Sequence, residues 1–362
     1  MSAAEAPIVG SILGTAIGDS IGLPYEGLSR RRAERLLGPP DRHRFFFGRG
    51  MVSDDTEHTC MVAQSLIGSG GDPDAFARQL AWRFRLWVLA LPAGIGFATL
   101  RSILKLWLGV SPQKSGVHSA GNGPAMRAAV IGAAVDDGAK LTRLVRSSTR
   151  ITHTDPRAES GALAVALAAQ MARQTDVVSG AAFLDRFRAY SKGGDDEPGP
   201  LIEDDGPERL TEDAVRAADE GLSTADFAAS MGLAKGVSGF VCHTVPVALH
   251  AWLTNQRDFR SAVRAVIQCG GDADTTGAIV GGIVGASVGG EGIPKEWLDR
   301  LIEWPRSTRW MERLAAQLDV TMQTGVAARP IRLPVYGVIP RNLFFLVVVL
   351  LHGARRVLPP YG

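Results

Sequence analysis

The chain has 362 residues, of which 46% are hydrophobic and 21% are charged, a composition that excludes a disordered protein and allows a large buried core. Its formal net charge of +2 gives no argument for a footprint on nucleic acid or on a membrane surface. Three widely spaced cysteines, Cys60, Cys242 and Cys269, form no CxxC pair, which excludes a cysteine zinc framework and favours a reducing cytoplasm.

Stretches rich in Ala, Leu, Val and Arg, broken by Gly, Pro and Asp, dominate the chain, and alternating strand patterns with hairpin turns are scarce. We therefore predict an all-α fold. The predicted helices span residues 7–23, 54–68, 74–90, 123–135, 157–173, 179–190, 208–219, 237–254, 258–268, 275–289 and 295–303.

The first predicted helix has glycine at every fourth position from residue 10 to residue 22, and the helix over 275–289 repeats this spacing from residue 277 to residue 289. Each set forms a stripe along one helix face. Because glycine costs a helix about 1 kcal/mol relative to alanine, we expect the stripes to serve close packing of these two helices. If the helices run antiparallel, Glu26 lies beside Asp272 and Asp274.

Two acidic clusters each precede a predicted helix, SDDT at residues 53–56 and DADT at residues 272–275. N-capping explains one Asp or Ser for each helix, but not two Asp with flanking hydroxyls in both places. Carboxylate and hydroxyl oxygens suit hard cations such as Mg²⁺, and carboxylates brought together without cations repel one another. We predict that the two clusters meet in a metal-binding cleft.

Residues 326–362 contain five prolines and are predicted to be a C-terminal extension of a single domain over residues 1–325. The apolar run LFFLVVVLL at 343–351 is shorter than the roughly 20 residues of a membrane-spanning helix. We expect no transmembrane span and predict a packed segment, with contact to a membrane or a partner as the alternative. The N-terminus lacks the basic region of a signal peptide, so we expect a cytoplasmic protein.

Five segments in chain order resemble a known family: GTAIGDSIGLPYEG at 14–27, SDDTEHT at 53–59, SAGNGPAMR at 119–127, THTDPRA at 152–158 and CGGDADTTGAIVGGIVGA at 269–286. The ordered set resembles the ADP-ribosylglycohydrolases over about residues 8–305. The resemblance implies a compact orthogonal multi-helix bundle with a binuclear metal cleft. It also implies hydrolysis of the glycosidic bond of an ADP-ribosyl adduct of a protein, nucleic acid or small molecule, with release of ADP-ribose.

By similarity to the family, two Mg²⁺ ions, or Mn²⁺, would be bound by a fixed set of oxygen ligands. These ligands would be Ser53, Asp54 and Asp55 from the first cluster and Asp272, Asp274 and Thr275 from the second. Glu26 resembles the mobile glutamate near the metals and is the first candidate for acid/base or gating work. Asp55 and Asp272 are expected to be essential to catalysis as well.

The resemblance also implies residues that contact the ADP-ribose. They are Gly121, Asn122 and Gly123 in one loop and His153 and Asp155 in a second motif. A Gly-rich loop allows backbone N–H groups to approach phosphate oxygens. The pattern of Asp155 and Arg157 fits a structural pair that caps the next helix as well as it fits a contact with the ADP-ribose.

One position departs from the family pattern. Members that cleave arginine-linked ADP-ribose often have an Asp before an Ile-Gly pair, where this chain has Gly94. The departure argues against an arginine linkage and for an O-linked or free metabolite substrate. Two alternatives stay open: a Mg²⁺-dependent phosphohydrolase of a nucleotide or ADP-sugar, and an inactive ADP-ribose-binding protein.

Overall fold

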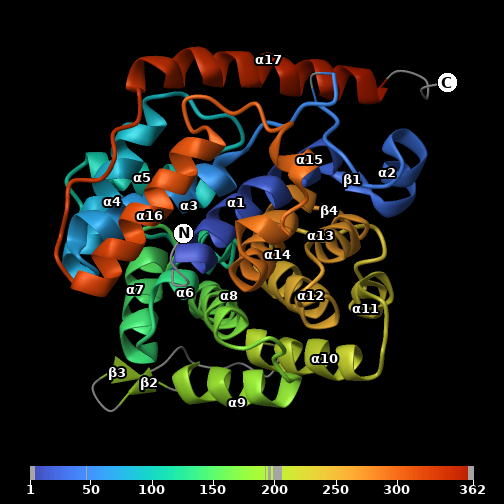
Figure 1. Ribbon diagram of the computed structural model, residues 1–362, viewed down its shortest axis with the longest axis horizontal. Helices are drawn as coiled ribbons and strands as arrows, with labels where there is room; N and C mark the ends of the chain where they lie inside the picture. Colours follow the sequence, from blue (N-terminus) through green and yellow to red (C-terminus); the bar gives the residue numbers. More distant parts are fainter. Residues whose placement is uncertain (1–4, 46, 192, 195–196, 199–205, 358–362) are drawn as a thin grey trace.

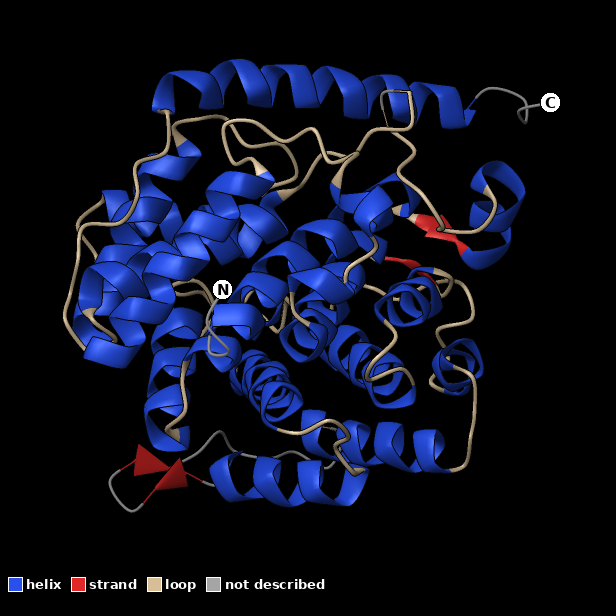
Figure 2. Ribbon diagram, in the orientation of Figure 1, coloured by secondary structure: helices blue, strands red, loops and turns tan. Residues whose placement is uncertain are grey.

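The computed structural model describes residues 5–45, 47–191, 193–194, 197–198 and 206–357. The described residues form helices joined by loops and two pairs of very short strands (Figures 1 and 2), which confirms the all-α prediction. The helices are α1 (Glu5–Gly22), α2 (Arg30–Leu37), α3 (Asp54–Ser69), α4 (Pro73–Val88), α5 (Phe97–Trp107), α6 (Ala129–Ala134), α7 (Gly138–Arg150), α8 (Pro156–Gln174), α9 (Gly180–Ser191), α10 (Pro207–Asp219), α11 (Thr224–Ser230), α12 (Val241–Thr254), α13 (Phe259–Ile267), α14 (Ala273–Val288), α15 (Lys295–Leu298), α16 (Thr308–Thr324) and α17 (Val338–Val357). Antiparallel pairs are formed by the strands β1 (Leu28–Ser29) with β4 (Gly270–Gly271) and β2 (Gly193–Gly194) with β3 (Glu197–Pro198).

The two glycine-striped helices, α1 and α14, pack against each other along their whole length at the centre of the bundle (Figure 1). Gly10 faces Gly285 and Gly18 faces Gly277, so the two helices pack together as predicted and run antiparallel, the condition on which the expected position of Glu26 depended. A Cβ atom at Gly18 would overlap the carbonyl oxygen of Gly277. Only glycine therefore permits this backbone approach, which brings the end of α1 to the start of α14.

The chain segments that follow α1 and precede α14 stay together beyond the helices. The Gly27 amide donates to the Gly271 carbonyl at 2.7 Å, and β1 pairs with β4 immediately afterwards. Helix α3 packs against α1 on another side of the bundle. The N-termini of α3 and α14, each with its acidic cluster, are thereby placed near the same end of α1.

Helix α17 lies across one side of the molecule as its outermost element (Figure 1). Its inner face buries Phe345 and Val348 against Leu23, Phe45 and Met51, in a small apolar cluster separate from the main core. These contacts confirm that the apolar run packs on the fold through one of its faces.

A buried ion pair holds the start of α17 in place. The Arg341 guanidinium donates to both carboxylate oxygens of Glu303 at 2.7 Å and to the Val52 carbonyl at 2.6 Å. Breaking such a pair leaves an uncompensated buried charge. The pair therefore fixes α17 to the segment that leads into the first acidic cluster.

Two helical segments are long and apolar enough to cross a membrane by length and composition, Ala6–Tyr25 and Val335–Arg356. The first is 89% buried inside the protein, so it is the central core helix. The second is only 33% buried. The apolar helix at the C-terminal end is thus much longer than the nine-residue run that the sequence displays.

Several predicted helix boundaries were wrong, and six helices among the described residues, α2, α5, α7, α11, α16 and α17, were not predicted. Helix α7 contains Thr142, Val145 and Thr149, whose β-branched side chains lower helix propensity. The helix forms nevertheless, because its apolar face packs on the core. The helix predicted over 237–254 begins only at Val241, because Val237 bridges to Gly271. The helix predicted over 295–303 ends at Leu298, since Ile302 donates to the Gly50 carbonyl.

Candidate active site

The first acidic cluster forms the N-terminus of α3. Ser53 is the N-cap residue: its hydroxyl accepts from the Asp55 amide at 3.3 Å and donates to Asp55 Oδ2 at 2.9 Å. Behind it, the buried carboxylate of Asp19 from α1 accepts from the Ser53 amide at 2.9 Å and the Thr56 hydroxyl at 2.5 Å. Asp19 thus fixes the start of α3 and the orientation of the cluster, while Asp54 is partly exposed beside it.

The second cluster forms the N-terminus of α14 and meets the first. The Asp272 amide donates to the Val237 carbonyl at 2.7 Å, and Asp272 Oδ2 accepts from the Asn122 side-chain amide at 2.6 Å. The Thr275 hydroxyl donates to Asp55 Oδ2 at 3.3 Å. This hydrogen bond joins side chains 220 residues apart and brings the two acidic clusters into one cleft.

Burial and mutual repulsion both act on the carboxylates of this cleft. Burial raises the pKa of Asp55 well above its usual value, and the charges of Asp19, Asp54 and Asp272 raise it further. Burial likewise raises the pKa of Asp274 well above its usual value, and the charges of Glu26 and Asp272 add to the effect. Protons or cations must therefore balance the charge of the cleft.

The donor set fits a hard cation. Asp55 Oδ1 and Asp274 Oδ1 are buried and have no hydrogen-bond partner, and a buried carboxylate oxygen left without a partner is costly. Among the described residues, no group of three or more His, Cys, Asp or Glu side chains is placed so that these residue types alone could hold a metal ion. The hydroxyls of Ser53 and Thr275 complete an oxygen set of the kind that Mg²⁺ binds.

Glu26 lies at the exposed edge of the cleft, just after the last turn of the α1 segment. Its pKa is raised, first by desolvation and then by the negative charge of Asp272. Glu26 also raises the pKa of Asp274. The structure therefore places Glu26 within electrostatic range of both acids of the second cluster, as the antiparallel packing predicts.

The loop 121–123 forms another wall of the cleft. The Asn122 amide donates to the Gly239 carbonyl at 3.0 Å, and the Asn122 side chain donates to Thr244 Oγ1 at 3.0 Å as well as to Asp272. Nothing in the sequence indicates that Thr244 belongs to this site, because it lies 122 residues away from Asn122. Asn122 thus links the loop directly to the second acidic cluster.

His153 is buried beneath this loop. A Cβ atom at Gly121 would lie 3.0 Å from His153 Nε2, and a Cβ atom at Gly123 would lie 3.2 Å from its Cε1, so the loop has no room for larger residues. Burial and the nearby Arg127 guanidinium lower the pKa of His153 to about 3. His153 is therefore neutral and supports the loop from below.

Asp155 has a capping geometry. It is the N-cap of α8, accepts from the Arg157 amide at 2.9 Å and pairs with the Arg157 guanidinium at 2.8 Å. The hydrogen bond from the Arg157 side chain lowers the pKa of Asp155. These contacts favour the structural pair over a substrate contact, the two alternatives that the sequence leaves open.

Helix α17 covers the Glu26 side of the cleft, a feature that no pattern in the sequence indicates. Arg356 Nη2 donates to the Glu26 carbonyl at 2.5 Å, and His352 Nε2 donates to the Pro24 carbonyl at 3.0 Å. A cavity of about 80 Å³ remains between α17 and the acidic side chains Asp54 and Asp274. Contacts across more than 320 residues leave no periodic pattern in a sequence.

We expect the stability of the chelator-treated protein to fall as the pH rises from 6.5 to 8. Burial raises the pKa of Asp19 to about 7, and the cluster carboxylates shift in the same direction, so the folded state holds protons that the unfolded state has already lost. Each proton that only the folded state holds lowers the free energy of unfolding by about 1.4 kcal/mol for each unit of rising pH. Thermal unfolding in EDTA at several pH values measures this slope.

The buried histidines determine the lower pH limit, 6.5, of the range in which this experiment is made. Burial lowers the pKa values of His43, His58, His153 and His250, which makes the protein less stable below about pH 6.5, where unfolded histidine becomes charged. Their contribution is flat above that pH. A melting temperature independent of pH between 6.5 and 8 in EDTA would contradict the buried-carboxylate account.

Comparisons with known proteins agree with this geometry. The family model described as ADP-ribosylglycohydrolase matches residues 2–327. An uncharacterized protein of Archaeoglobus fulgidus is 31% identical over 318 residues, 85% of this chain and 94% of that protein. The ADP-ribosyl-[dinitrogen reductase] glycohydrolase of Rhodospirillum rubrum is 26% identical over 302 residues, 81% of this chain and 89% of that enzyme.

A solved structure, titled an ADP-ribosylglycohydrolase-related protein complex, has the same fold. It superposes with a TM-score of 0.60 at 26% identity and covers 89% of this chain and 100% of its own. Fold and cleft together define an all-α hydrolase that acts on glycosyl bonds. The chain belongs to the ADP-ribosylglycohydrolase family.

Proposed function

We propose that this protein is a Mg²⁺-dependent hydrolase that cleaves the bond at the distal ribose of an ADP-ribosyl adduct and releases intact ADP-ribose. The observation that carries the proposal is the meeting of two acidic helix N-termini, joined by the Thr275–Asp55 hydrogen bond and holding two buried, unpartnered carboxylate oxygens. Ser53, Asp54, Asp55, Asp272, Asp274 and Thr275 would hold two Mg²⁺ or Mn²⁺ ions. Bound there, the ions supply charge neutralisation, orientation of the ribose hydroxyls and activation of a water.

The protein's own groups act around the anomeric carbon. Cleavage of a glycosidic bond passes through a transition state with oxocarbenium character, and the carboxylates of the cleft stabilise its positive charge. Glu26, at the exposed edge, has a raised pKa and is suited to donate a proton to the leaving group and accept one from the attacking water. Asn122 orients Asp272 through its side-chain amide.

The surroundings of Glu26 favour a small leaving group. The cavity between Glu26 and α17 measures about 80 Å³, well below the roughly 300 Å³ of the smallest ligand pockets. Gly94, where arginine-specific relatives often have an acid, lines the same cavity. Residue 94 itself supplies no carboxylate to bind a guanidinium leaving group, and the size of the cavity favours an O-linked amino acid or acyl group.

Thermal-shift titrations with Mg²⁺, Mn²⁺ or EDTA, each with and without ADP-ribose, test binding. We expect a metal-dependent rise in melting temperature and a further rise with ADP-ribose, because a ligand at 100 times its Kd stabilises the folded state by about 2.7 kcal/mol. No response to metal or ADP-ribose would contradict the proposal.

A product analysis tests the reaction itself. Arginine-linked, serine-linked and O-acetyl-ADP-ribose are incubated with the Mg²⁺-loaded protein and separated by chromatography. We expect intact ADP-ribose, with the O-linked substrates cleaved faster than the arginine adduct. AMP or inorganic phosphate would indicate a phosphohydrolase instead, and binding without any cleavage would indicate an ADP-ribose-binding protein.

A further inference from the structure

The outer face of α17 is apolar and uncovered. Large hydrophobic side chains recur at helical spacing along it, each at least 40% exposed: Ile339, Leu343, Phe344, Leu346, Val347, Leu350 and Leu351. The opposite face is already used to pack Phe345 and Val348 on the fold. A helix that is apolar all round is normally buried on all sides, and exposed apolar patches of this kind mark interaction surfaces.

A second exposed apolar group stands near the C-terminal half of α17. Phe47 is 93% exposed at the tip of the turn closed by the Phe45–Arg49 bridge, with a φ of 58°. A positive φ is unfavourable for a bulky residue, and such strain tends to be kept where it serves a function. The turn presents the Phe47 ring to the surroundings.

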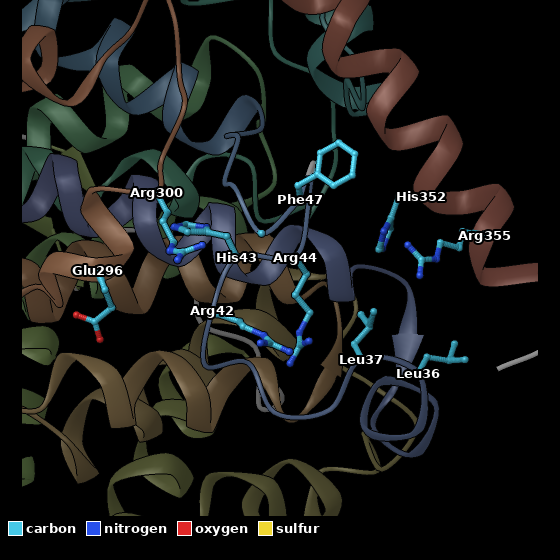
Figure 3. A pocket seen from close by; sticks show the side chains of 11 residues that line it. Leu36, Leu37, Arg42, His43, Arg44, Phe47, Glu296, Arg300, His352 and Arg355 are labelled. Carbon is cyan, nitrogen blue, oxygen red and sulfur yellow. The ribbon is translucent and has the colours of Figure 1, made fainter. Parts of the chain in front are cut away.

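Phe47 stands at the rim of a basic cavity of about 690 Å³ (Figure 3). Arginines from three separate segments, Arg42, Arg300 and Arg355, line it. Its one acidic lining residue among those described, Glu296, pairs with Arg260. Arg355 comes from α17 itself, so the basic cavity adjoins the apolar helix.

We propose that this side of the protein docks on a lipid bilayer that contains anionic lipids. Helix α17 lies in the plane of the bilayer with its outer face at the acyl-chain boundary, as interfacial helices do. The basic cavity receives phosphate headgroups, because arginines close to an anionic surface are attracted to it. At the opposite end of α17, the exposed rings of Trp304 and Tyr336 lie 6.0 Å apart, a pair suited to the headgroup region.

Charge favours a bilayer over a second copy of the chain. Helix α17, VIPRNLFFLVVVLLHGARRV, contains no Asp or Glu. A second α17 packed against the first would bury the apolar face but offer no acidic partner to the arginines at its end. An anionic bilayer satisfies the apolar face and the basic cavity together.

Vesicle flotation of the full chain tests the proposal. Vesicles of phosphatidylcholine alone are compared with equal parts of phosphatidylcholine and phosphatidylglycerol, at low and high salt. We expect the protein to float with the mixed vesicles. The triple variant Val347→Ser/Leu350→Ser/Leu351→Ser should bind at least about tenfold less, because three exposed anchors lose their apolar surface.

Two further variants separate the contributions. Arg42→Gln/Arg300→Gln should bind the mixed vesicles several-fold less and lose salt sensitivity, with little change on phosphatidylcholine. The control Leu108→Ser/Val177→Ser removes two side chains that are more exposed than those of the α17 variant and lie in loops elsewhere on the protein. It should bind as the wild type does.

Three outcomes overturn the proposal. The first is a wild-type protein that floats with neither vesicle. The second is a control variant that loses as much binding as the α17 variant. The third is a dimer in light scattering that the α17 variant abolishes, with no vesicle binding by the wild type, which would assign the apolar face to a second copy.

Discussion

Asp55→Ala and Asp272→Ala are each expected to reduce turnover of an ADP-ribosyl substrate by more than about 100-fold. Loss of an outer hydrogen-bonding partner of a metal ligand already costs 10- to 100-fold, and these residues are proposed to bind the ions directly. In EDTA the melting temperature of both variants should be equal to or above that of the wild type. Burial disfavours the charged form of both carboxylates, and the charge of Asp272 raises the pKa values of Asp55 and Glu26. Steady-state rates and thermal unfolding measure the two effects.

The matched control is Asp137→Ala. Asp137 is also an N-cap aspartate, accepting from the Lys140 amide at 2.6 Å at the start of α7, but it lies outside the cleft. Its loss should lower stability by about 1 kcal/mol and leave turnover unchanged. If Asp55→Ala behaved like Asp137→Ala, with full activity and reduced stability, the acidic clusters would be helix caps and the site assignment would fail.

Gly18→Ala is expected to lower the free energy of unfolding by about 1–2 kcal/mol. The added Cβ atom would overlap the Gly277 carbonyl, so the two central helices must separate, and overpacking of a core commonly costs 1–3 kcal/mol. The alanine gains about 1 kcal/mol of helix propensity in return. The midpoint of urea unfolding gives the net change.

Gly353→Ala is the matched control, since Gly353 also lies within a helix but has no atom within 4 Å of an added Cβ. It should raise stability by about 1 kcal/mol. Gly18→Ala should also weaken Mg²⁺ binding, because the separation moves Asp272 and Asp274 away from α3. An unchanged urea midpoint for Gly18→Ala would contradict the packing account.

The features that could be predicted from the sequence are those with a local pattern. The four-residue glycine repeat and the paired acids ahead of two helices are short-range signals. Together they predicted the close packing of the two helices and the meeting of the two acidic clusters, while the antiparallel direction entered only as a condition. The position of Glu26 followed from the same packing. The ligand set and the two ions remain proposals.

The features that could not be predicted depend on contacts between distant residues. Thr244 accepts a hydrogen bond from Asn122, and Arg356 donates one to the Glu26 carbonyl. Both contacts result from tertiary packing, which the spacing of residues in the sequence does not indicate. The sequence showed the apolar composition of residues 343–351. It did not show that the helix extends to Val357 or that the helix lies over the cleft. Asp155 shows the reverse limit, because its motif fitted a ligand contact and a helix cap equally well, and only the structure shows the geometry of a cap.

The pairing of α1 with α14 has a consequence for synthesis of the chain. Gly10 and Gly285 are roughly 270 residues apart, so at about 5–20 residues per second the ribosome needs between a quarter of a minute and a minute to complete the partner of α1. During this interval an apolar segment long enough to cross a membrane has no native site. Nascent chains should therefore depend on chaperones that shield their first helix, and slower translation of the second half should increase aggregation.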